Sequence, residues 1–560
     1  MHSLGSDHTK FASKYLNTTI CFIIVQFFFW VGHLHDAALP GLYMDAVNPD
    51  YLAGKTLNPE LRNATWFPPT EIFPLLGNLY HGVQNYYVGL PVFELLGFNM
   101  LSLRVSQGVF ASGILILYQI IIMKATGSRS VSLVGSLCLA IDMAFLASFR
   151  TQMYIVISGV FWLFMSLYFI FKMDSYRISK NNPNSGITRG LLRSDWIIPG
   201  VFSGLSIYSY FVFSFFVPAL LIIVYLSARN IACVFRFCAG LCIGVLPYVV
   251  GYISLAAALG GVTPALDWLK NALGGLDPMS DHQGLWQRLE YSWSLVYLAL
   301  SNYGNNILIF GSADKPIFAC AKIYTMAISF IILFLYFIFD VIKRKRGNDY
   351  DIRMYSSVVL LPISFIVISS VFGSRLWAHH FSALIPLCYL ILFLAISRVL
   401  HGGLGGGKVW RVSFSVALCL LFLIGNTLQQ RAFFLKLEET GGVGKFSDAI
   451  NRMADNAMSL PEQVVHVFPE WGFMMPFAFL TGNRRLYETD LSVEILGRLA
   501  REGKIVRIYY WDAADTGKYK KIVAESGFKV TTDGQYMQRD HNVAFNWMEA
   551  ASSDQSGKDW

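Results

Sequence analysis

The sequence predicts a mainly α-helical, polytopic membrane protein with about eleven transmembrane helices and a small C-terminal α/β domain. Of its 560 residues, 54% are hydrophobic and only 14% are charged, whereas an ordinary soluble domain carries about 25% charged residues. The apolar residues fall into separate runs of roughly 17–25 residues, which is long enough to cross about 30 Å of hydrocarbon. Together these observations exclude a soluble enzyme, a disordered chain and a fibrous repeat.

Eleven apolar runs are candidates for the spans. They lie near residues 17–34, 103–123, 130–149, 152–172, 196–210, 211–228, 237–259, 318–342, 354–373, 379–397 and 411–427. Pro199, Pro218 and Pro247 interrupt long runs, so the boundaries of two pairs of spans are open, and the count ranges from ten to thirteen. The first run follows Lys10 and Lys14 but is too long for a secretory signal, which predicts a retained signal anchor.

The distribution of positive charge predicts the orientation. Residues 1–427 hold 28 Lys and Arg residues, of which 19 fall in one set of alternating segments. Because Lys and Arg collect in cytoplasmic loops, the N-terminus is expected to be cytoplasmic and the C-terminus to lie outside. The chain is thus expected to be a multi-pass protein of the inner (plasma) membrane, and its net charge of +8 reflects topology instead of a nucleic-acid partner.

Charge density divides the chain into two domains. About 11% of residues 1–427 are charged, compared with about 26% of residues 428–560, which is typical of a soluble domain. The first part is expected to be a transmembrane body with long outer loops at about 35–102 and 260–317. The second part alternates strand and helix patterns and has no glycine-rich phosphate motif, so a periplasmic docking or accessory domain is predicted.

Asp45 is the strongest candidate for a catalytic residue. It follows the first span by about ten residues, in a turn-forming stretch that contains Pro40-Gly41 and Asn48-Pro49. A carboxylate near the membrane surface, beside a lipid-borne substrate, could act as a general base on an acceptor hydroxyl. The alternative is a solvated loop aspartate or a helix cap. Asp50 and Asp36 are weaker candidates in the same loop.

Positively charged residues and histidines at the outer ends of spans are candidates for phosphate binding. Arg104, Arg150 and Arg375 stand out because the outer face otherwise carries little positive charge, and the planar guanidinium group binds two phosphate oxygens. Snorkelling toward the interface is the alternative for each. His379 and His380 could donate hydrogen bonds to a phosphate, whereas adjacent histidines on a helix point apart, which argues against a shared metal ion.

Two further residues, Asp142 and Asn63, each have a functional and a non-functional interpretation. Asp142 lies inside the third predicted span, where an acidic residue is expected to be either functional or paired. Asn63 begins an Asn-Ala-Thr sequon in the first outer loop, which would be a glycosylation site in a eukaryotic secretory protein and has no meaning in a bacterium.

The order of these features resembles that of the GT-C glycosyltransferases, specifically the bacterial family 39 or Rgt-like group. The acidic residue of the first outer loop is Asp45, in residues 41–45. Residues 80–87, followed by residues 90–99 and Leu103-Arg104, resemble the family's approach to the second span. The stretch from His379 to Pro386 is similar to the start of a late span. The resemblance covers nearly the whole chain, although each motif is loose.

The resemblance implies an inverting transfer of a sugar from a polyprenyl-phosphate donor to a glycan, lipid or protein acceptor on the outer face. Asp45 would be the catalytic acid of the first loop, with Asp50 as a second acidic residue. Arg104 and Arg375 would hold the lipid phosphate. The further candidates for substrate binding are Tyr86, His81, Arg150, His379 and His380. Many family members have Asp-Glu in the first loop, whereas Ala46 follows Asp45 here. A divalent metal is therefore left open without a residue pattern to support it, and no other cofactor is predicted.

Two other functions compete with glycosyl transfer. A transporter or flippase of lipid-linked glycans is the second hypothesis, but it predicts internal repeats, paired broken helices and short loops. No repeat is evident, and the first outer loop is long. A non-catalytic assembly partner is the third hypothesis, and it would make Asp45 dispensable.

Overall fold

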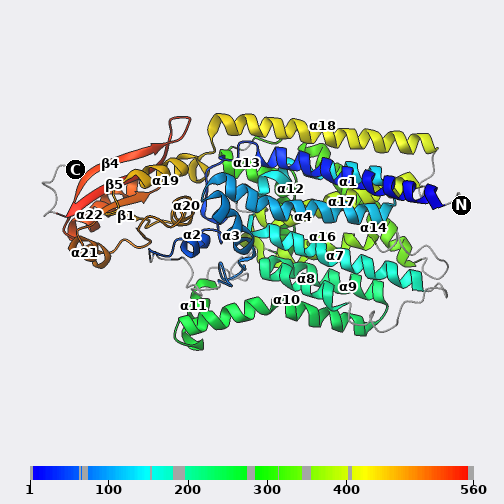
Figure 1. The fold of residues 1–560 in the computed structure, drawn as a ribbon, viewed down its shortest axis with the longest axis horizontal. Coiled ribbons are helices and arrows are strands. Elements are labelled where there is room, and N and C mark those ends of the chain that lie inside the picture. Colours follow the sequence, from blue (N-terminus) through cyan, green and yellow to red (C-terminus); the bar gives the residue numbers. More distant parts are fainter. Residues whose placement is uncertain are drawn as a thin grey trace.

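The computed structural model describes residues 4–61, 63, 65, 74–151, 154–180, 196–273, 284–312, 314–342, 355–401 and 407–552. The chain forms a bundle of long helices, here called the body, with a small sheet domain at one end (Figure 1). We call this sheet domain, residues 441–552, the tail domain, and the end of the body that carries it the tail-facing end. The N-terminus lies at the opposite end of the body.

Apolar helices occupy all eleven predicted spans in the described part of the chain. Seven are long and apolar enough to cross a membrane, and four shorter apolar helices match the remaining spans. The helices are α1 (Leu4–Leu34), α4 (Met100–Thr126), α5 (Arg129–Ala140), α7 (Tyr154–Lys180), α8 (Ile197–Ser209), η3 (Phe211–Phe216) with α9 (Val217–Ala228), α10 (Ile231–Ala258), α14 (Ala319–Ile342), η6 (Ser356–Val359) with α16 (Leu360–Phe372), η8 (Ala378–Ala383) with α17 (Leu384–His401), and α18 (Lys408–Thr440). The chain is therefore a polytopic membrane protein, as predicted.

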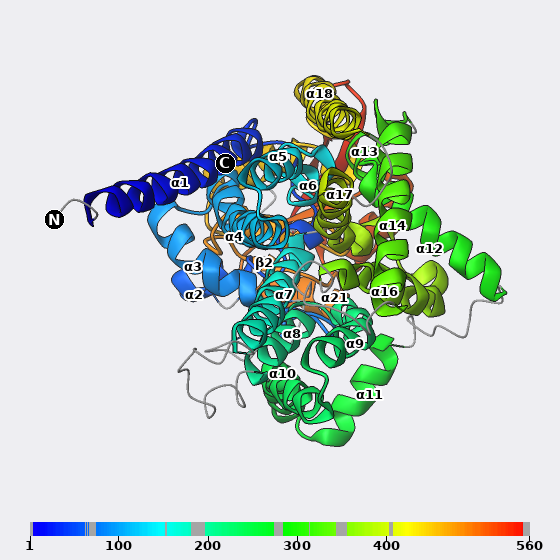
Figure 2. The ribbon, with the colours of Figure 1, turned by 90° about the vertical axis from the view of Figure 1, so that its right-hand side faces the viewer.

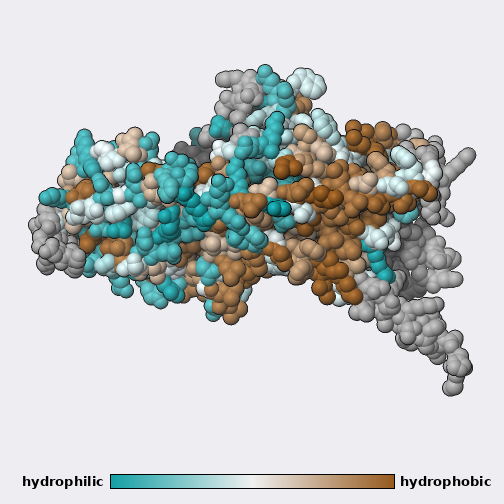
Figure 3. All heavy atoms as spheres, turned by 90° about the horizontal axis from the view of Figure 1, so that it is seen from above, coloured by the Kyte–Doolittle hydropathy of each residue, from teal (hydrophilic) through white to brown (hydrophobic). Residues whose placement is uncertain are grey.

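Burial separates central from peripheral helices. Helices α4, α7 and α17 lie near the centre of the bundle, and α1, α10 and α18 lie at its rim (Figure 2). The central helices are mostly buried inside the protein, whereas α10, α14 and α18 expose most of their apolar side chains. The face seen in Figure 3 is correspondingly hydrophobic over the body and hydrophilic over the tail domain. This division is what a lipid-facing rim requires.

Glycines allow α8 and α10 to pack with their backbones in contact. Gly200 and Gly204 of α8 face Gly240 and Gly244 of α10, and a Cβ atom at any of the four would lie 2.1–2.3 Å from a carbonyl oxygen of the partner helix. Small residues at a four-residue spacing permit this close approach between membrane helices. Any larger side chain at these positions would push the two helices apart.

Short helices cover the tail-facing end of the body. They are η1 (Met44–Ala46), α2 (Leu52–Leu57), α3 (Gln84–Leu96), α6 (Met143–Ser148), α11 (Val262–Leu273), α12 (Leu285–Leu300), α13 (Tyr303–Phe310) and η7 (Gly373–Arg375). Helices α11 and α12 expose large apolar side chains, among them Val262, Leu266 and Trp286, as expected for segments that lie at a membrane interface. Residues 66–73 and 274–283 of the two predicted long loops lie outside the described residues.

The tail domain is a five-stranded mixed sheet with helices. Its elements are η9 (Gly444–Phe446), α19 (Ala449–Ser459), β1 (Val464–Val467), α20 (Met474–Leu480), β2 (Tyr487–Glu488), α21 (Val493–Arg501), β3 (Ile505–Tyr510), η10 (Ala513–Asp515), α22 (Thr516–Glu525), β4 (Phe528–Met537) and β5 (Val543–Ser552). The strand order is β2-β1-β3-β5-β4, parallel among β2, β1 and β3 and antiparallel among β3, β5 and β4. The predicted α/β domain is thus present. The predicted division at residues 427 and 428 falls inside α18.

The tail domain is fastened to the loop that follows α1. Gly41 N donates to Phe446 O at 2.9 Å. The buried side chain of Asn63 donates from Nδ2 to Asn483 Oδ1 and to Arg485 O, both at 2.8 Å, and accepts from Tyr487 N at 3.1 Å. The sequon at Asn63 is therefore not presented on the surface of the folded chain. Loop and tail domain form one continuous apolar core at this junction.

Candidate functional site

Asp45 lies in η1, a segment of one 3-10 turn, between the body and the tail domain. Gln107 Nε2 of α4 donates to Ala46 O at 3.3 Å, and Gly472 N of the tail domain donates to Met44 Sδ at 3.0 Å. These contacts hold the turn from both sides. Burial raises the pKa of the Asp45 carboxyl to about 6, against an opposing effect of the positive charge on Lys445. A carboxyl with this pKa is mostly ionised at neutral pH and can accept a proton.

Two tyrosines link Asp45 to the histidines of the tail-facing end. Burial, reinforced by the negative charge of Asp45, raises the pKa of Tyr80 to about 12. The Tyr80 ring contacts the Tyr210 ring edge to face at 5.5 Å. The Tyr210 hydroxyl and His380 Nε2 share a hydrogen bond of 2.9 Å. Asp45, whose charge acts on Tyr80, and His380, which bonds to Tyr210, thus lie near the same pair of tyrosines although they are 335 positions apart in the sequence.

His81 also joins this group. Asn48 Nδ2 donates to His81 Nε2 at 3.3 Å, and His81 Nδ1 donates to Gly82 O at 3.1 Å. The His81 ring stacks against the Tyr210 ring. Burial lowers the pKa of His81 to about 4, so the imidazole is neutral at pH 7. A neutral, fully engaged His81 is suited to holding the loop at Asn48 in place.

Lys445 supplies positive charge beside Asp45. It lies in η9, directly after α18, and its side chain is exposed. Its Nζ atom is 5.5 Å from the centre of the Tyr43 ring and 5.9 Å from that of the Trp511 ring, within reach of cation–π attraction. The tail domain therefore contributes a cation to the neighbourhood of the candidate base.

Asp50 and Tyr86 lie in the core under the loop and not on its surface. The Asp50 side chain is fully buried, and a Cβ atom on Gly89 of α3 would lie 2.7 Å from Asp50 Oδ1. Tyr86 is also buried, and its hydroxyl shares a hydrogen bond of 2.9 Å with Thr56 Oγ1. Asp50 is therefore packed against α3, and Tyr86 belongs to α3 and bonds to α2, so both predicted site residues support the fold of the loop.

Arg104 and Arg150 are fully buried and use their N–H groups on the protein itself. Arg104 Nη1 donates to Gln107 Oε1 at 3.1 Å, and its other nitrogens donate to main-chain carbonyls, including that of Ala37 at 3.4 Å. Arg150 Nη2 donates to the carbonyls of His33, at 2.6 Å, and His35. The sequence predicted that these arginines bind phosphate. In this structure they fasten the start of the first loop to α4 and to the end of α6.

Arg375 and His379 differ in their surroundings. Arg375 ends η7 and its side chain is exposed at the tail-facing end. The rings of His379 and His380 stack with 4.0 Å between centres, and His379 lines a very small cavity of about 10 Å³ with Ser148 and Asn305. Of the residues predicted from sequence, His81 and His380 belong to the group around Asp45, and Arg375 offers an exposed guanidinium group.

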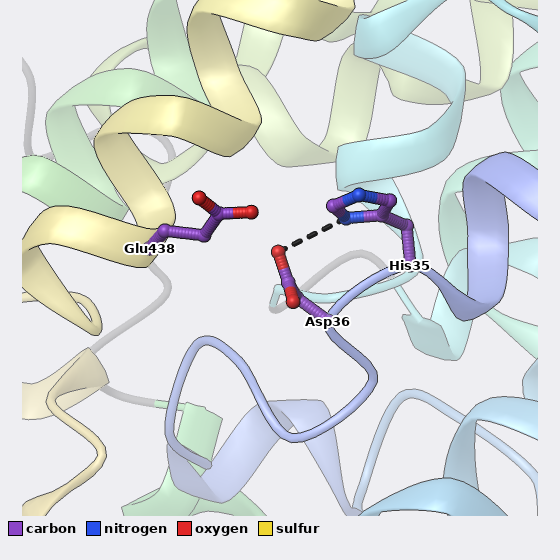
Figure 4. A group of neighbouring side chains, drawn as sticks. All are labelled: His35, Asp36 and Glu438. Atoms are coloured by element: carbon purple, nitrogen blue, oxygen red, sulfur yellow. Dashed lines mark ion pairs between the residues drawn. The ribbon is translucent and has the colours of Figure 1, made fainter.

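A separate group of possible metal ligands lies where α1 meets α18. His35, Asp36 and Glu438 each bring one ligand atom within 4.8 Å of the others (Figure 4). His35 Nδ1 and Asp36 Oδ2 are 2.9 Å apart. No cysteine or second histidine joins these three in the described residues, and exposed acidic groups gather on many protein surfaces without a metal. Asp36, a weak candidate base from sequence, belongs to this group.

Asp142 is paired deep inside the body. Its Oδ1 accepts from Phe145 N at 2.9 Å and so caps α6. Its Oδ2 forms an ion pair with Lys322 of α14 and accepts from the Tyr389 hydroxyl of α17 at 2.5 Å. Asn426 of α18 donates to that hydroxyl at 2.8 Å. Of the two interpretations from sequence, the structure therefore favours the paired one.

Sequence reasoning missed several residues of the site. Tyr80 was seen only as part of a motif, and Tyr210, Lys445 and Trp511 were not singled out. Lys445 carried a weak signal, because it is the third basic residue, after Arg431 and Lys436, that follows the last predicted span on the side predicted to be poor in positive charge. The aromatic residues carried none, since 15% of the chain is aromatic.

Comparison with known proteins finds similarity in structure alone. No protein-family profile and no curated protein sequence matches the chain. The solved structure of ArnT from Cupriavidus metallidurans bound to undecaprenyl phosphate aligns with 97% of this chain and 99% of its own, with a TM-score of 0.51 and 12% identity. The same protein in the apo state gives 98% and 100% coverage, a TM-score of 0.52 and 11% identity. AglB from Archaeoglobus fulgidus, in complex with an inhibitory peptide and a dolichol-phosphate, aligns with 88% of this chain and 69% of its own at a TM-score of 0.48 and 12% identity.

The alignment with ArnT extends over body and tail domain together. The chain is thus a polytopic membrane protein with the GT-C fold, and the resemblance predicted from sequence is confirmed at the level of fold. At 11–12% identity, this likeness extends to the fold and not to a substrate.

Proposed function

We propose that the chain is a membrane glycosyltransferase that moves a sugar from a polyprenyl-phosphate donor to an acceptor hydroxyl at the tail-facing end. The observation that carries this proposal is Asp45, a partly buried carboxyl whose pKa is raised to about 6 at the junction of body and tail domain. The likeness to ArnT, which was solved with bound undecaprenyl phosphate, supports a polyprenyl-phosphate donor. The membrane body supplies the lipid surface that such a donor needs.

Asp45 acts as the general base in the proposed reaction. Its carboxylate takes the proton of the acceptor hydroxyl while the hydroxyl oxygen forms a bond to the anomeric carbon. The bond between that carbon and the phosphate oxygen breaks, and its electron pair leaves with the polyprenyl phosphate. Attack opposite the leaving group inverts the anomeric carbon. The proton then passes from Asp45 to water, which returns the base to its ionised form.

Positive charge next to Asp45 stabilises the departing phosphate. Lys445 is the cation whose charge acts on Asp45, and a fixed cation beside a developing anion lowers the barrier to its departure. Arg375 is exposed at the same end and is a second candidate for phosphate contact, with His379 and His380 as further candidates. Arg104 and Arg150 have positioning roles in this scheme, because their donors hold the loop that carries Asp45.

The orientation and location predicted from the sequence become part of this proposal. The tail domain lies on the outer, periplasmic side and the N-terminus in the cytoplasm, so transfer takes place outside the inner membrane. The sugar is a hexose or pentose, and the acceptor a glycan, lipid or protein. A divalent metal stays an open prediction. Transport of lipid-linked glycans and a non-catalytic assembly role are the alternatives that the experiment has to exclude.

Reconstitution with labelled polyprenyl-phosphate sugars tests the proposal. The full chain is placed in liposomes with a mixture of saccharide, lipid and peptide acceptors, and label transfer is compared among the wild type, Asp45→Asn and Asp455→Asn. Asp455 is an exposed residue of α19 and serves as the matched control. We expect Asp45→Asn to lower transfer by about 10²–10⁴-fold, the usual contribution of a general base, and Asp455→Asn to leave it unchanged.

Two results would contradict the assignment. Equal transfer by Asp45→Asn and the wild type would remove Asp45 from the reaction. Movement of intact lipid-linked glycan across the liposome membrane, without label transfer to any acceptor, would favour the transporter.

A further inference from the structure

Two aromatic rings lie beside Lys445 where the tail domain meets the first loop, and a third aromatic side chain contacts one of them. We call Tyr43, Trp471 and Trp511 the aromatic platform. Lys445 Nζ lies over the rings of Tyr43 and Trp511, and the Tyr43 and Trp471 side chains are joined by a hydrogen bond. Tyr43 precedes Asp45 by two residues. The platform is therefore next to the proposed base and is built from both parts of the chain.

The platform is held rigidly. The Trp511 ring stacks on Phe473 with 4.0 Å between centres and an interplanar angle of 17°. Trp511 Nε1 donates to Trp471 O at 2.8 Å, and Trp511 N donates to Glu470 Oε2 at 2.7 Å. The other Glu470 oxygen accepts from the Tyr519 hydroxyl at 2.7 Å. Fixed aromatic rings lose little conformational entropy when a ligand binds.

Gly472 allows the two sides of the platform to approach each other. It adopts a φ of +119°, and a Cβ atom there would lie 2.9 Å from both the Tyr43 and the Trp511 ring. A side chain at this position would strain the backbone and separate the rings. The platform thus depends on the docking of the segment around Gly472 onto the first loop.

Trp471 differs from the other exposed tryptophans in its place in the fold. Large exposed aromatic residues such as Trp286, Trp293 and Trp410 belong to body helices, where lipid or the interface accounts for them. Trp471 is 37% exposed, and it lies in the tail domain, whose visible face is hydrophilic (Figure 3). Among the described residues of the tail domain, the other large hydrophobic side chains with comparable exposure are Met458, Val493 and Val543. Trp471 differs from these three because it is aromatic and contacts Tyr43, two residues from Asp45, so it is placed to contact a substrate at Asp45.

We propose that the aromatic platform binds the acceptor and that the acceptor is a saccharide. This inference rests on the proposed glycosyl transfer. A sugar ring has one face of C–H groups, which packs against an aromatic ring, and an edge of hydroxyl groups, one of which would point to Asp45. The exposed indole of Trp471 supplies the flat apolar surface. The neighbouring Lys445 and Glu470 give the platform a polar rim that suits hydroxyl groups and would disfavour an acyl chain.

Binding to defined arrays tests this assignment without requiring turnover. The purified full chain in detergent is applied to a printed array of oligosaccharides and, in parallel, to arrays of peptides and of lipids. The variants are Trp471→Ala, the conservative Trp471→Phe, and Trp410→Ala as a matched control from an exposed tryptophan of α18. Thermal unfolding of each variant is measured alongside to show that it is folded.

We expect the wild type to bind saccharide spots, with affinity about tenfold lower for Trp471→Ala, as the loss of one well-packed aromatic contact predicts. Trp471→Phe should keep most of the affinity, and Trp410→Ala all of it. Failure to bind any saccharide, equal binding by Trp471→Ala and the wild type, or binding to peptides or lipids alone would overturn the inference.

Asp45→Asn separates the two proposals. If both hold, this variant still binds saccharide spots, and it fails in transfer. If it transfers label normally, the role of Asp45 is refuted, while the array comparison still decides whether Trp471 binds a saccharide.

Discussion

Asp45 in the first loop and Asp142 inside the body are carboxylates with opposite surroundings. Asp142 is fully buried, and both its oxygens have partners: a backbone N–H, the Lys322 ammonium and the Tyr389 hydroxyl. Asp45 is partly exposed, and its pKa is raised to about 6 because burial outweighs the attraction of Lys445. The protein supplies partners to both oxygens of Asp142, whereas burial disfavours the ionised form of Asp45.

This difference separates a structural acid, Asp142, from the proposed general base, Asp45. A carboxylate with all its oxygens engaged joins helices and has nothing left to offer a substrate, and here α6, α14, α17 and α18 meet at Asp142. A carboxylate with a raised pKa retains a tendency to take up a proton, which is what a general base needs. The contrast also predicts that substitutions at the two sites will change stability in opposite directions.

Removing the partner of Asp142 should have the largest effect on stability. Lys322→Met leaves a charged carboxylate buried in the body, and such losses destabilise proteins by about 3–5 kcal/mol. Thermal unfolding in detergent, followed by circular dichroism, should show a clear fall in Tm. The double variant Asp142→Asn with Lys322→Met should recover part of the loss, because neither charge remains. A single variant as stable as the wild type would contradict a structural role for the pair.

Neutralising Asp45 should instead stabilise the chain at neutral pH. Because the folded pKa of about 6 lies above the ordinary 3.8, folding favours the protonated carboxyl, and this contribution is lost as the pH rises from about 4 to about 6. Asp45→Asn avoids that loss, so above pH 6 its unfolding free energy should exceed that of the wild type, by at most about 3 kcal/mol. The Tm difference between the two chains should shrink as the pH falls to 4. A destabilised variant at pH 7.5 would show that the Asp45 charge is well solvated.

The sequence predicted the helices well because crossing a membrane leaves a local signal. Each span needs a continuous apolar run, and all eleven runs correspond to apolar helices. Asp45 could be singled out for a similar reason, since its short distance from the first span puts it near the membrane surface. These features depend on residues that are close together along the chain.

Arg104 and Lys445 show what the sequence could not give. Arg104 has the residue type and the place of a phosphate ligand, yet its burial and its bond to Gln107 depend on how the first loop folds back over α4. Lys445 approaches Asp45 across 400 positions of sequence because α18 returns the chain to the tail-facing end. Trp471 reaches Tyr43 in the same way. Contacts of this kind are set by tertiary packing.

The raised pKa of Asp45 predicts a pH dependence for transfer. A base works in its ionised form, so the transfer rate at subsaturating donor should rise tenfold per pH unit well below pH 6 and level off above it. Initial rates of label transfer between pH 4.5 and 8.5 measure this profile. The Tm over the same range shows that the chain stays folded. A rate that is constant from pH 4.5 to 8.5 would mean that no group with this pKa takes part.

Lys445 should set the pH midpoint of this rate profile. Replacing it should have a smaller effect than the substitutions described above. Its positive charge favours the ionised form of Asp45, so Lys445→Met should move the midpoint to higher pH, and Lys445→Arg should keep it near the wild-type value. Lys436→Met is the matched control, because Lys436 pairs with Asp314 on the neighbouring surface and should leave the midpoint unchanged. Added salt screens charges and should move the wild-type midpoint toward that of Lys445→Met. If Lys445→Met lowers the rate equally at every pH, the lysine contacts the donor phosphate without tuning Asp45, and the two carboxylates would then differ by burial alone.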